Sequence, residues 1–106
     1  MRRAPTHPGD VLREDVLPAM ELTQEQFAEI LGLSRKTINQ ILARKSPVSA
    51  ETAVKLGLLF GNSPQFWMNM QSGYDLWIAR QQMAPKVLQD LEQLHVQYDE
   101  FLKTNR

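Results

Sequence analysis

The sequence contains no cysteine, and this absence excludes disulfides, thiolate metal sites and thiol nucleophiles together. A small chain without disulfides is typical of a reducing compartment. No apolar run approaches the roughly 20 residues that are needed to span a bilayer, and no apolar stretch follows Arg2 and Arg3 as a secretory signal requires. We therefore expect a cytoplasmic protein that does not contact the membrane.

Catalytic and metal-binding patterns are also missing. His7 and His95 are far apart in the sequence, and neither belongs to an HExxH or paired-carboxylate pattern. We expect His7 near the start of the first helix. The glycines do not cluster into a phosphate-binding loop, and no Ser-His-Asp set is indicated. The sequence therefore predicts no enzymatic activity, no metal and no cofactor.

The chain has no net charge, because 12 Lys and Arg residues balance 12 Asp and Glu residues. This balance argues against nucleic-acid binding, since nucleic-acid-binding domains usually have a basic surplus. The charges are unevenly distributed, however. The segment between Glu29 and Glu51 has four basic residues and no acidic one, namely Arg35, Lys36, Arg44 and Lys45. The balanced total therefore leaves room for a local basic surface.

No segment longer than a few residues alternates apolar and polar side chains, so strands are not expected. At 106 residues the chain is long enough for one domain, and its prolines fit a division into helices. We expect every proline except Pro5 between helices or at the start of one, Pro18 included. The expected helices cover residues 8–17, 24–31, 35–43, 49–60, a segment from 64, and 87–102.

Apolar residues at helical spacing indicate the core of this helical domain. Gly57 is a weak point in its helix, costing about 1 kcal/mol relative to alanine, and suggests the close approach of another helix. In the segment 87–102 the apolar residues recur every 3.5 positions, which is the spacing of helices that pack lengthwise. We expect it to pack on the body or on a partner protomer, with the groove of another protein as the alternative. The residues expected to face inward are Leu12, Val16, Met20, Phe27, Ile30, Leu31, Ile38, Ile41, Leu42, Ala53, Leu56, Leu59 and Phe60.

The segment 24–43 has the pattern of a helix-turn-helix. Thr23 and Gln26 form a capping box before the first helix, and Gly32 supplies the turn before Ser34 caps the second helix. Ala28 is small where the two helices cross. The outer face of the second helix reads Ser34, Arg35, Lys36, Thr37, Asn39, Gln40 and Arg44.

These polar side chains are of the types that read base edges in the major groove. Arginine pairs with guanine through two hydrogen bonds, and asparagine or glutamine does so with adenine. Such a face also occurs on an ordinary solvated helix. The coincidence of cap, small residue, glycine turn and apolar spacing in one short segment favours DNA binding.

Three blocks of the sequence resemble the HigA-type antitoxins, which are members of the XRE (phage-repressor-like) helix-turn-helix family. Together they span about residues 7–79, two thirds of the chain. The blocks are the core TQEQFAEILGLSRKTINQILARK, the opening His7-Pro8-Gly9-Asp10, and the segment SPQFWMNMQ with the later YDLW.

The resemblance implies an all-α, lambda-repressor-like domain of five or six helices that forms a homodimer. It implies a repressor that binds a palindromic operator through the major groove and neutralises a HigB/RelE-like mRNA-cleaving toxin. Gln24 and Lys45 would bind phosphates. The family commonly has glycine before this lysine, whereas this chain has Arg44, which alters the helix-ending turn and adds a charge to the DNA-binding set. The groove-facing residues would be Ser34, Arg35, Lys36, Thr37, Asn39 and Gln40.

The resemblance also suggests three parts, an N-terminal arm (1–7), a helix-turn-helix domain (8–83) and an amphipathic extension (84–106) whose role is not inherited. The helix from residue 64 is expected to pair the protomers. Its aromatic stripe fits burial in the protomer or the dimer better than a toxin or ligand site. Arg2 and Arg3 would form a mobile tail or an arm that reaches a phosphate. The residues expected to pair the protomers are the aromatic stripe, Phe66, Trp67, Tyr74 and Trp77, together with Met70.

Two other functions remain open at this stage. The first is a stand-alone transcriptional regulator of the same fold without a toxin partner. The second is a protein-interaction module in which the helix-turn-helix no longer binds DNA.

Overall fold

The computed structural model describes residues 4–104, which form six helices and no strand. The expected all-α fold of five or six helices is therefore confirmed. Arg2 and Arg3 lie outside the described residues. The first helix runs over residues 8–20 and consists of α1 (Pro8–Val11), η1 (Leu12–Val16) and α2 (Leu17–Met20).

This first helix is longer than the sequence predicted, and the expectation that Pro18 separates two segments was wrong. Proline inside a helix has no N–H to donate, and its ring clashes with the carbonyl one turn earlier. The helix avoids this clash because η1 is a π-helical segment, in which the Leu17 N–H donates to Leu12 O five residues before it. The helix then ends at Glu21, whose φ is 54°.

The helix-turn-helix comprises α3 (Gln24–Leu31) and α4 (Arg35–Leu42). Both hydrogen bonds of the predicted capping box are present, from the Gln26 N–H to Thr23 Oγ1 at 3.1 Å and from the Thr23 N–H to Gln26 Oε1 at 2.9 Å. Gly32 ends α3 in the left-handed conformation with a φ of 65°. Ser34 then caps α4, because its Oγ accepts the Thr37 N–H at 3.0 Å. The local sequence therefore forms the corner as predicted.

Two further helices, α5 (Ala50–Phe60) and α6 (Pro64–Gln82), follow Ser49 and Ser63, whose side chains cap them. Gly57 is required where the chain turns from one to the other. A Cβ at this position would lie 2.8 Å from Asn62 O and 3.0 Å from Pro64. The expected close approach at Gly57 is thus confirmed, and it is made by the start of α6 and the residues before it.

The core lies among α1, η1, α2, α3, α4, α5 and the first turns of α6. Three residues expected in it are exposed instead, namely Met20 (42%), Ile30 (50%) and Leu59 (38%). Met20 is in the last turn of α2, and the other two line a shallow surface groove between α3 and α5. The core residues are Leu12, Leu17, Phe27, Ala28, Leu31, Ile38, Ile41, Leu42, Val48, Ala53, Leu56 and Trp67.

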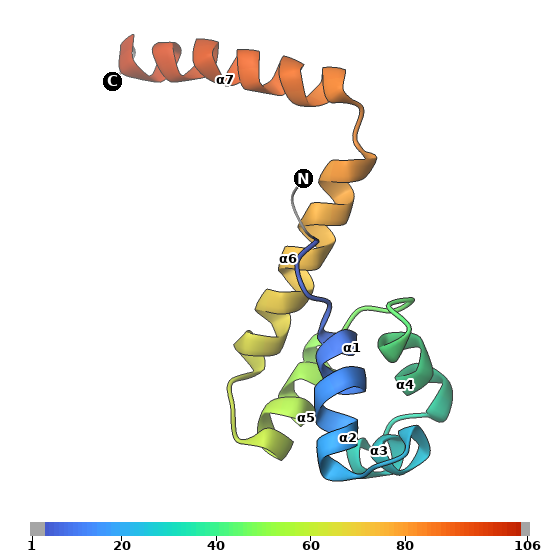
Figure 1. Ribbon diagram of the computed structural model, residues 1–106. Helices are drawn as coiled ribbons and strands as arrows, with labels where there is room; N and C mark the ends of the chain where they lie inside the picture. Colours follow the sequence, from blue (N-terminus) through green and yellow to red (C-terminus); the bar gives the residue numbers. More distant parts are fainter. Residues whose placement is uncertain (1–3, 105–106) are drawn as a thin grey trace.

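The last helix, α7 (Pro85–Thr104), lies away from this body at the far end of α6 (Figure 1). It has no buried residue, although its apolar stripe is complete. The radius of gyration is 18.9 Å, whereas a compact domain of this size has one of about 13 Å. None of the helices in the described part of the chain is long and apolar enough to cross a membrane.

Candidate nucleic-acid interface

The recognition helix α4 has one apolar and one polar face. Ile38, Ile41 and Leu42 are buried in the core, which fixes the rotation of α4 against α3. The opposite face carries exposed residues at Arg35, Lys36 and Asn39, as expected. A charged and an amide side chain one turn apart can reach neighbouring base edges in a major groove.

The other polar residues expected on this face have internal hydrogen bonds. The Ser34 and Thr37 hydroxyl oxygens lie 2.7 Å apart, and Ser34 also caps the helix. The Oε1 of Gln40 accepts from Ser46 Oγ at 3.1 Å. Thr37 and Gln40 are half-buried. These residues shape the ends of α4, while the outermost positions are those of Arg35, Lys36 and Asn39.

The expected phosphate contacts, Gln24 and Lys45, are both exposed. Gln24 is the first residue of α3, and Lys45 follows α4. Arg35 also lies near an acidic residue, because its Nη1 is 3.9 Å from Glu25 Oε2 and both side chains are about 70% exposed. An exposed ion pair of this kind contributes at most about 1 kcal/mol. Arg35 can therefore leave Glu25 when a phosphate or base approaches.

The chain turns after α4 in a Schellman motif. The Lys45 N–H donates to Gln40 O at 2.8 Å, and the Arg44 N–H donates to Ile41 O at 3.1 Å. Arg44 takes the left-handed position of this motif with a φ of 62°. Glycine suits this position, and a residue with a Cβ costs about 1–2 kcal/mol there. The turn therefore keeps the geometry that glycine favours although arginine occupies it.

The Arg44 side chain points to α1 and away from the free face of α4. Its Nε donates to Asp10 Oδ1 at 2.9 Å and its Nη2 to Asp10 Oδ2 at 2.5 Å. Arg13 also donates to Asp10 Oδ1, at 2.9 Å, and its Nη1 donates to Leu42 O. The two guanidinium groups, that of Arg44 first, hold the pKa of Asp10 below its ordinary value. The Arg44 guanidinium is therefore paired with Asp10 in this structure, and its expected place in the DNA-binding set stays a prediction.

Asp10 belongs to the block His7-Pro8-Gly9-Asp10, whose individual roles were not predicted beyond the position of His7. His7 is the N-cap of α1, as its expected place implied, and its Nδ1 accepts the Gly9 N–H at 2.9 Å. The ring is buried and lies edge-on to Tyr74, with the ring centroids 4.8 Å apart. Burial lowers the pKa of His7 below its ordinary value.

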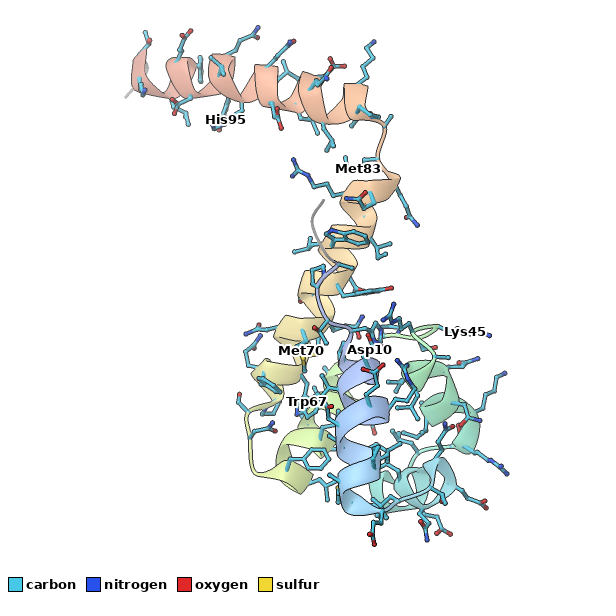
Figure 2. The ribbon with its side chains drawn as sticks, in the orientation of Figure 1. Asp10, Lys45, Trp67, Met70, Met83 and His95 are labelled. Carbon is cyan, nitrogen blue, oxygen red and sulfur yellow. The ribbon has the colours of Figure 1, made fainter. Side chains whose placement is uncertain are left out.

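Gly9 lets α1 touch the end of the recognition helix. A Cβ on Gly9 would lie 2.1 Å from Ile41 O, which is too close for any side chain. Asp10 and Lys45 lie at the same end of the helical body (Figure 2). The block therefore joins α1 to the last turn of α4.

The residues expected to pair protomers have different surroundings. Trp67 is 2% exposed, and its Nε1 donates to Asn62 Oδ1 at 3.0 Å. Of the two places expected for the stripe, protomer or dimer, Trp67 takes the first, because the first turns of α6 press this face against α5. Phe66 is exposed, while Met70, Tyr74 and Trp77 are half-buried.

Gln71, the last residue of the segment SPQFWMNMQ, has a structural role. Gln71 is buried, its Oε1 accepts the Val48 N–H at 2.8 Å, and its Nε2 donates to Asp75 at 2.8 Å.

Among the described residues, no group of three or more His, Asp or Glu side chains could hold a metal ion. The exposed side chains suited to DNA that were predicted on the helix-turn-helix lie on α4 and its flanks.

Known proteins with these features are similar to this chain. A family model described as helix-turn-helix matches residues 12–67. An uncharacterized HTH-type transcriptional regulator of Haemophilus influenzae is 39% identical over 73% of this chain and 72% of its own. Antitoxin HigA-1 of Vibrio cholerae is 34% identical over 74% of each chain. The structure of the Pseudomonas aeruginosa antitoxin HigA with the higBA promoter has a TM-score of 0.68 and 35% identity, and the match covers 76% of this chain and 97% of that one. This chain belongs to the HigA-type helix-turn-helix family.

Membership in the HigA-type family confirms the resemblance carried by the three sequence blocks. It also places the chain among the DNA-binding helix-turn-helix proteins. The family model ends within the first turn of α6, so α7 lies outside the matched helix-turn-helix region.

Proposed function

We propose that this HigA-type protein is an antitoxin that binds operator DNA, represses its own operon and neutralises a HigB/RelE-like mRNA-cleaving toxin. The exposed face of α4 is the observation that carries the proposal, because it combines base-reading side chains with the basic segment of a chain whose net charge is zero. It acts by binding and has no catalytic role.

In this proposal α4 enters the major groove. Arg35 and Asn39 select bases, and Lys36 lies beside them. Gln24 and Lys45 bind phosphates on either side and fix the register. Ser34, Thr37 and Gln40 hold the ends of α4 in shape, and Gln40 contributes its amide to base reading where the groove allows.

The proposed homodimer pairs through the outer face of α6. Phe66 is 49% exposed and Leu76 is 71% exposed, and Trp77 is half-buried beside them. Large apolar side chains left on a surface favour an interface. A twofold axis through this face would set two α4 helices about one DNA turn, roughly 34–36 Å, apart, which suits a palindromic operator.

The three proposed parts of the chain keep their roles with one change. The helix-turn-helix domain (8–83) includes His7, since this residue caps α1 and is buried. The arm is then residues 1–6, of which the described residues 4–6 are exposed. The extension (84–106) contains α7, whose exposed apolar stripe leaves it available for a partner.

A stand-alone regulator without a toxin is the second candidate. The similar protein of Haemophilus influenzae bears only the name of a transcriptional regulator, which favours this alternative. The neighbouring reading frame separates the two. Co-purification with a small toxin encoded there, and rescue of growth by this chain, would support the antitoxin, whereas the absence of such a gene would support the regulator.

DNA binding is tested by titrating the full chain into a labelled duplex that covers the region upstream of its own reading frame. Substituting Arg35→Ala together with Asn39→Ala should weaken binding strongly, because the two side chains that select bases are removed. Lys86→Ala removes an exposed charge from α7 and is the matched control, expected to bind like the wild type. Equal binding by the double variant would overturn the assignment of α4. Absence of wild-type binding would favour a protein-interaction module that no longer binds DNA.

A further inference from the structure

Arginine at position 44 lowers the stability of the turn relative to glycine. The position requires a positive φ, which glycine adopts freely and other residues adopt at a cost of about 1–2 kcal/mol. The backbone hydrogen bonds of the turn do not need the side chain, because the Schellman pattern uses only N–H and C=O groups. The function of Arg44 must therefore lie in what its guanidinium contacts.

That contact is a clamp between α1 and the end of α4. The clamp consists of Asp10, Arg13 and Arg44. The Asp10 side chain is 11% exposed, so its two hydrogen bonds from Arg44 are partly shielded from water. Arg13 joins the same carboxylate and also donates to Leu42 O at the end of α4. Two cations thus lie where the carbonyl groups of α4 point outward, and cations are favoured at a helix C-terminus.

Lys45 follows this clamp directly. Its N–H is tied to Gln40 O at 2.8 Å, and its side chain is exposed. On the α1 side, the absence of a Cβ at Gly9 lets the backbone meet Ile41 O. The position of the residue after Arg44 relative to α4 is therefore set by contacts on both sides of the turn.

We propose that Arg44 is a positioning residue for DNA binding that acts through Lys45, because its pairing with Asp10 holds the turn in which Lys45 meets a phosphate. This inference rests on the proposed function. It differs from the simple alternative, in which Arg44 leaves Asp10 and contacts a phosphate itself.

The two mechanisms agree that Arg44→Gly weakens binding, but they predict opposite effects for Asp10→Asn. Arg44→Gly removes the guanidinium and keeps a residue suited to the turn, whereas Asp10→Asn keeps Arg44 and removes the charge that holds it. If Arg44 positions Lys45, both variants weaken binding to the promoter duplex by about three- to tenfold, in the range of coupling within one network. If Arg44 contacts a phosphate, Asp10→Asn strengthens binding, and that result would overturn the proposal.

A double-mutant cycle with Lys45→Gln completes the test. Arg44→Gly should weaken binding in the wild-type background and change it less than twofold in the Lys45→Gln background. An equal loss of affinity in both backgrounds would mean that Arg44 acts independently of Lys45, and no loss in either would mean a role in the fold alone. Both results contradict the proposal. Should Asp10→Asn fail to give a cooperative melt, the Arg44→Gly cycle decides by itself.

The outcomes also separate this inference from the proposed function. A wild-type chain that does not bind the promoter duplex fails the proposed function. A wild type that binds, with an additive cycle, fails only the inference. Lys45→Gln should in addition lower the magnitude of the slope of log affinity against log salt concentration by about 0.9 for each phosphate that the variant no longer neutralises. Arg44→Gly should lower it by no more than Lys45→Gln does, because it acts only through the Lys45 contact.

Discussion

At the scale of single residues, the block His7-Pro8-Gly9-Asp10 has a physical explanation. His7 closes the first turn of α1 with a neutral ring nitrogen, and Asp10 holds two guanidinium groups. Each role depends on a protonation state, since a protonated Nδ1 cannot accept the Gly9 N–H and a neutral Asp10 loses its charge-assisted bonds.

The chain should lose stability in acid, and His7 should cause the first part of the loss. The pKa of His7 is lowered in the folded chain below its ordinary 6.5, so the unfolded chain binds the proton first. Its contribution is complete above about pH 6.5 and is lost as the pH falls through the lower folded value. Asp10, with a pKa held below 3.8, contributes in the same direction only at more acidic pH.

The measurement is the melting temperature between pH 8 and pH 5 for the wild type and for His7→Asn. Asparagine keeps an acceptor at the N-cap and does not titrate, so the variant should melt at a temperature that depends less on pH. His95→Asn, on exposed α7, is the control and should retain the wild-type profile. An unchanged profile in His7→Asn would contradict the role assigned to the buried ring.

The residue scale also shows why the pairing of Arg44 with Asp10 was not predicted. In the sequence it stands beside Lys45 in a basic segment, and its partner Asp10 is 34 positions away. Local charge counting finds the cation and cannot find a carboxylate that only the fold brings near. The caps Thr23, Ser34, Ser49 and Ser63 were predictable, because each acts on a residue two or three positions along the chain.

At the scale of elements, contacts between helices determine several features that the local sequence pattern does not predict. The π-helical segment that admits Pro18 has no signature in apolar spacing. Ile30 and Leu59 have the spacing of core residues, yet they line the groove between α3 and α5. The requirement for Gly9 is likewise invisible in the sequence, since it comes from Ile41 O on another helix.

Two glycine-to-alanine substitutions test this helix packing, because one should destabilise the chain and the other should stabilise it. Gly9→Ala puts a Cβ against backbone that cannot give way, and overpacking of this kind costs about 1–3 kcal/mol or more. Gly73→Ala, inside α6, meets no atom closer than 4.0 Å and should stabilise the chain by up to about 1 kcal/mol. Chemical denaturation gives both values. A neutral Gly9→Ala variant would show that α1 does not press on α4 as described.

At the scale of the whole molecule, the chain is a helical body with a long projection. The six helices were largely predictable from caps and apolar periods, whereas their arrangement was not. The wide apolar stripe of α7 indicated packing, but all of its described residues are unburied in a single chain. A single sequence cannot tell whether such a stripe faces its own body or another molecule.

The proposed dimer can be tested by placing a charge on α6. Leu76→Glu should convert the dimer to a monomer, because a carboxylate would be buried in an apolar interface without a partner. Leu58→Glu is the matched control, since Leu58 is 80% exposed and Leu76 is 71% exposed. Light scattering after size-exclusion chromatography gives both masses. Dissociation by Leu58→Glu alone would move the interface to the groove between α3 and α5.

The central claim is that the exposed face of α4 reads DNA sequence. Its most direct test is the ratio of affinities for the promoter duplex and for an unrelated duplex of equal length, measured for the wild type, Asn39→Ala and Lys45→Gln at one salt concentration. We expect a wild-type ratio of about 1,000 or more, a ratio reduced by at least about fivefold in Asn39→Ala, and an unchanged ratio with weaker binding to both duplexes in Lys45→Gln. A wild-type ratio near one, or an Asn39→Ala variant with the full wild-type ratio, would contradict the assignment of α4.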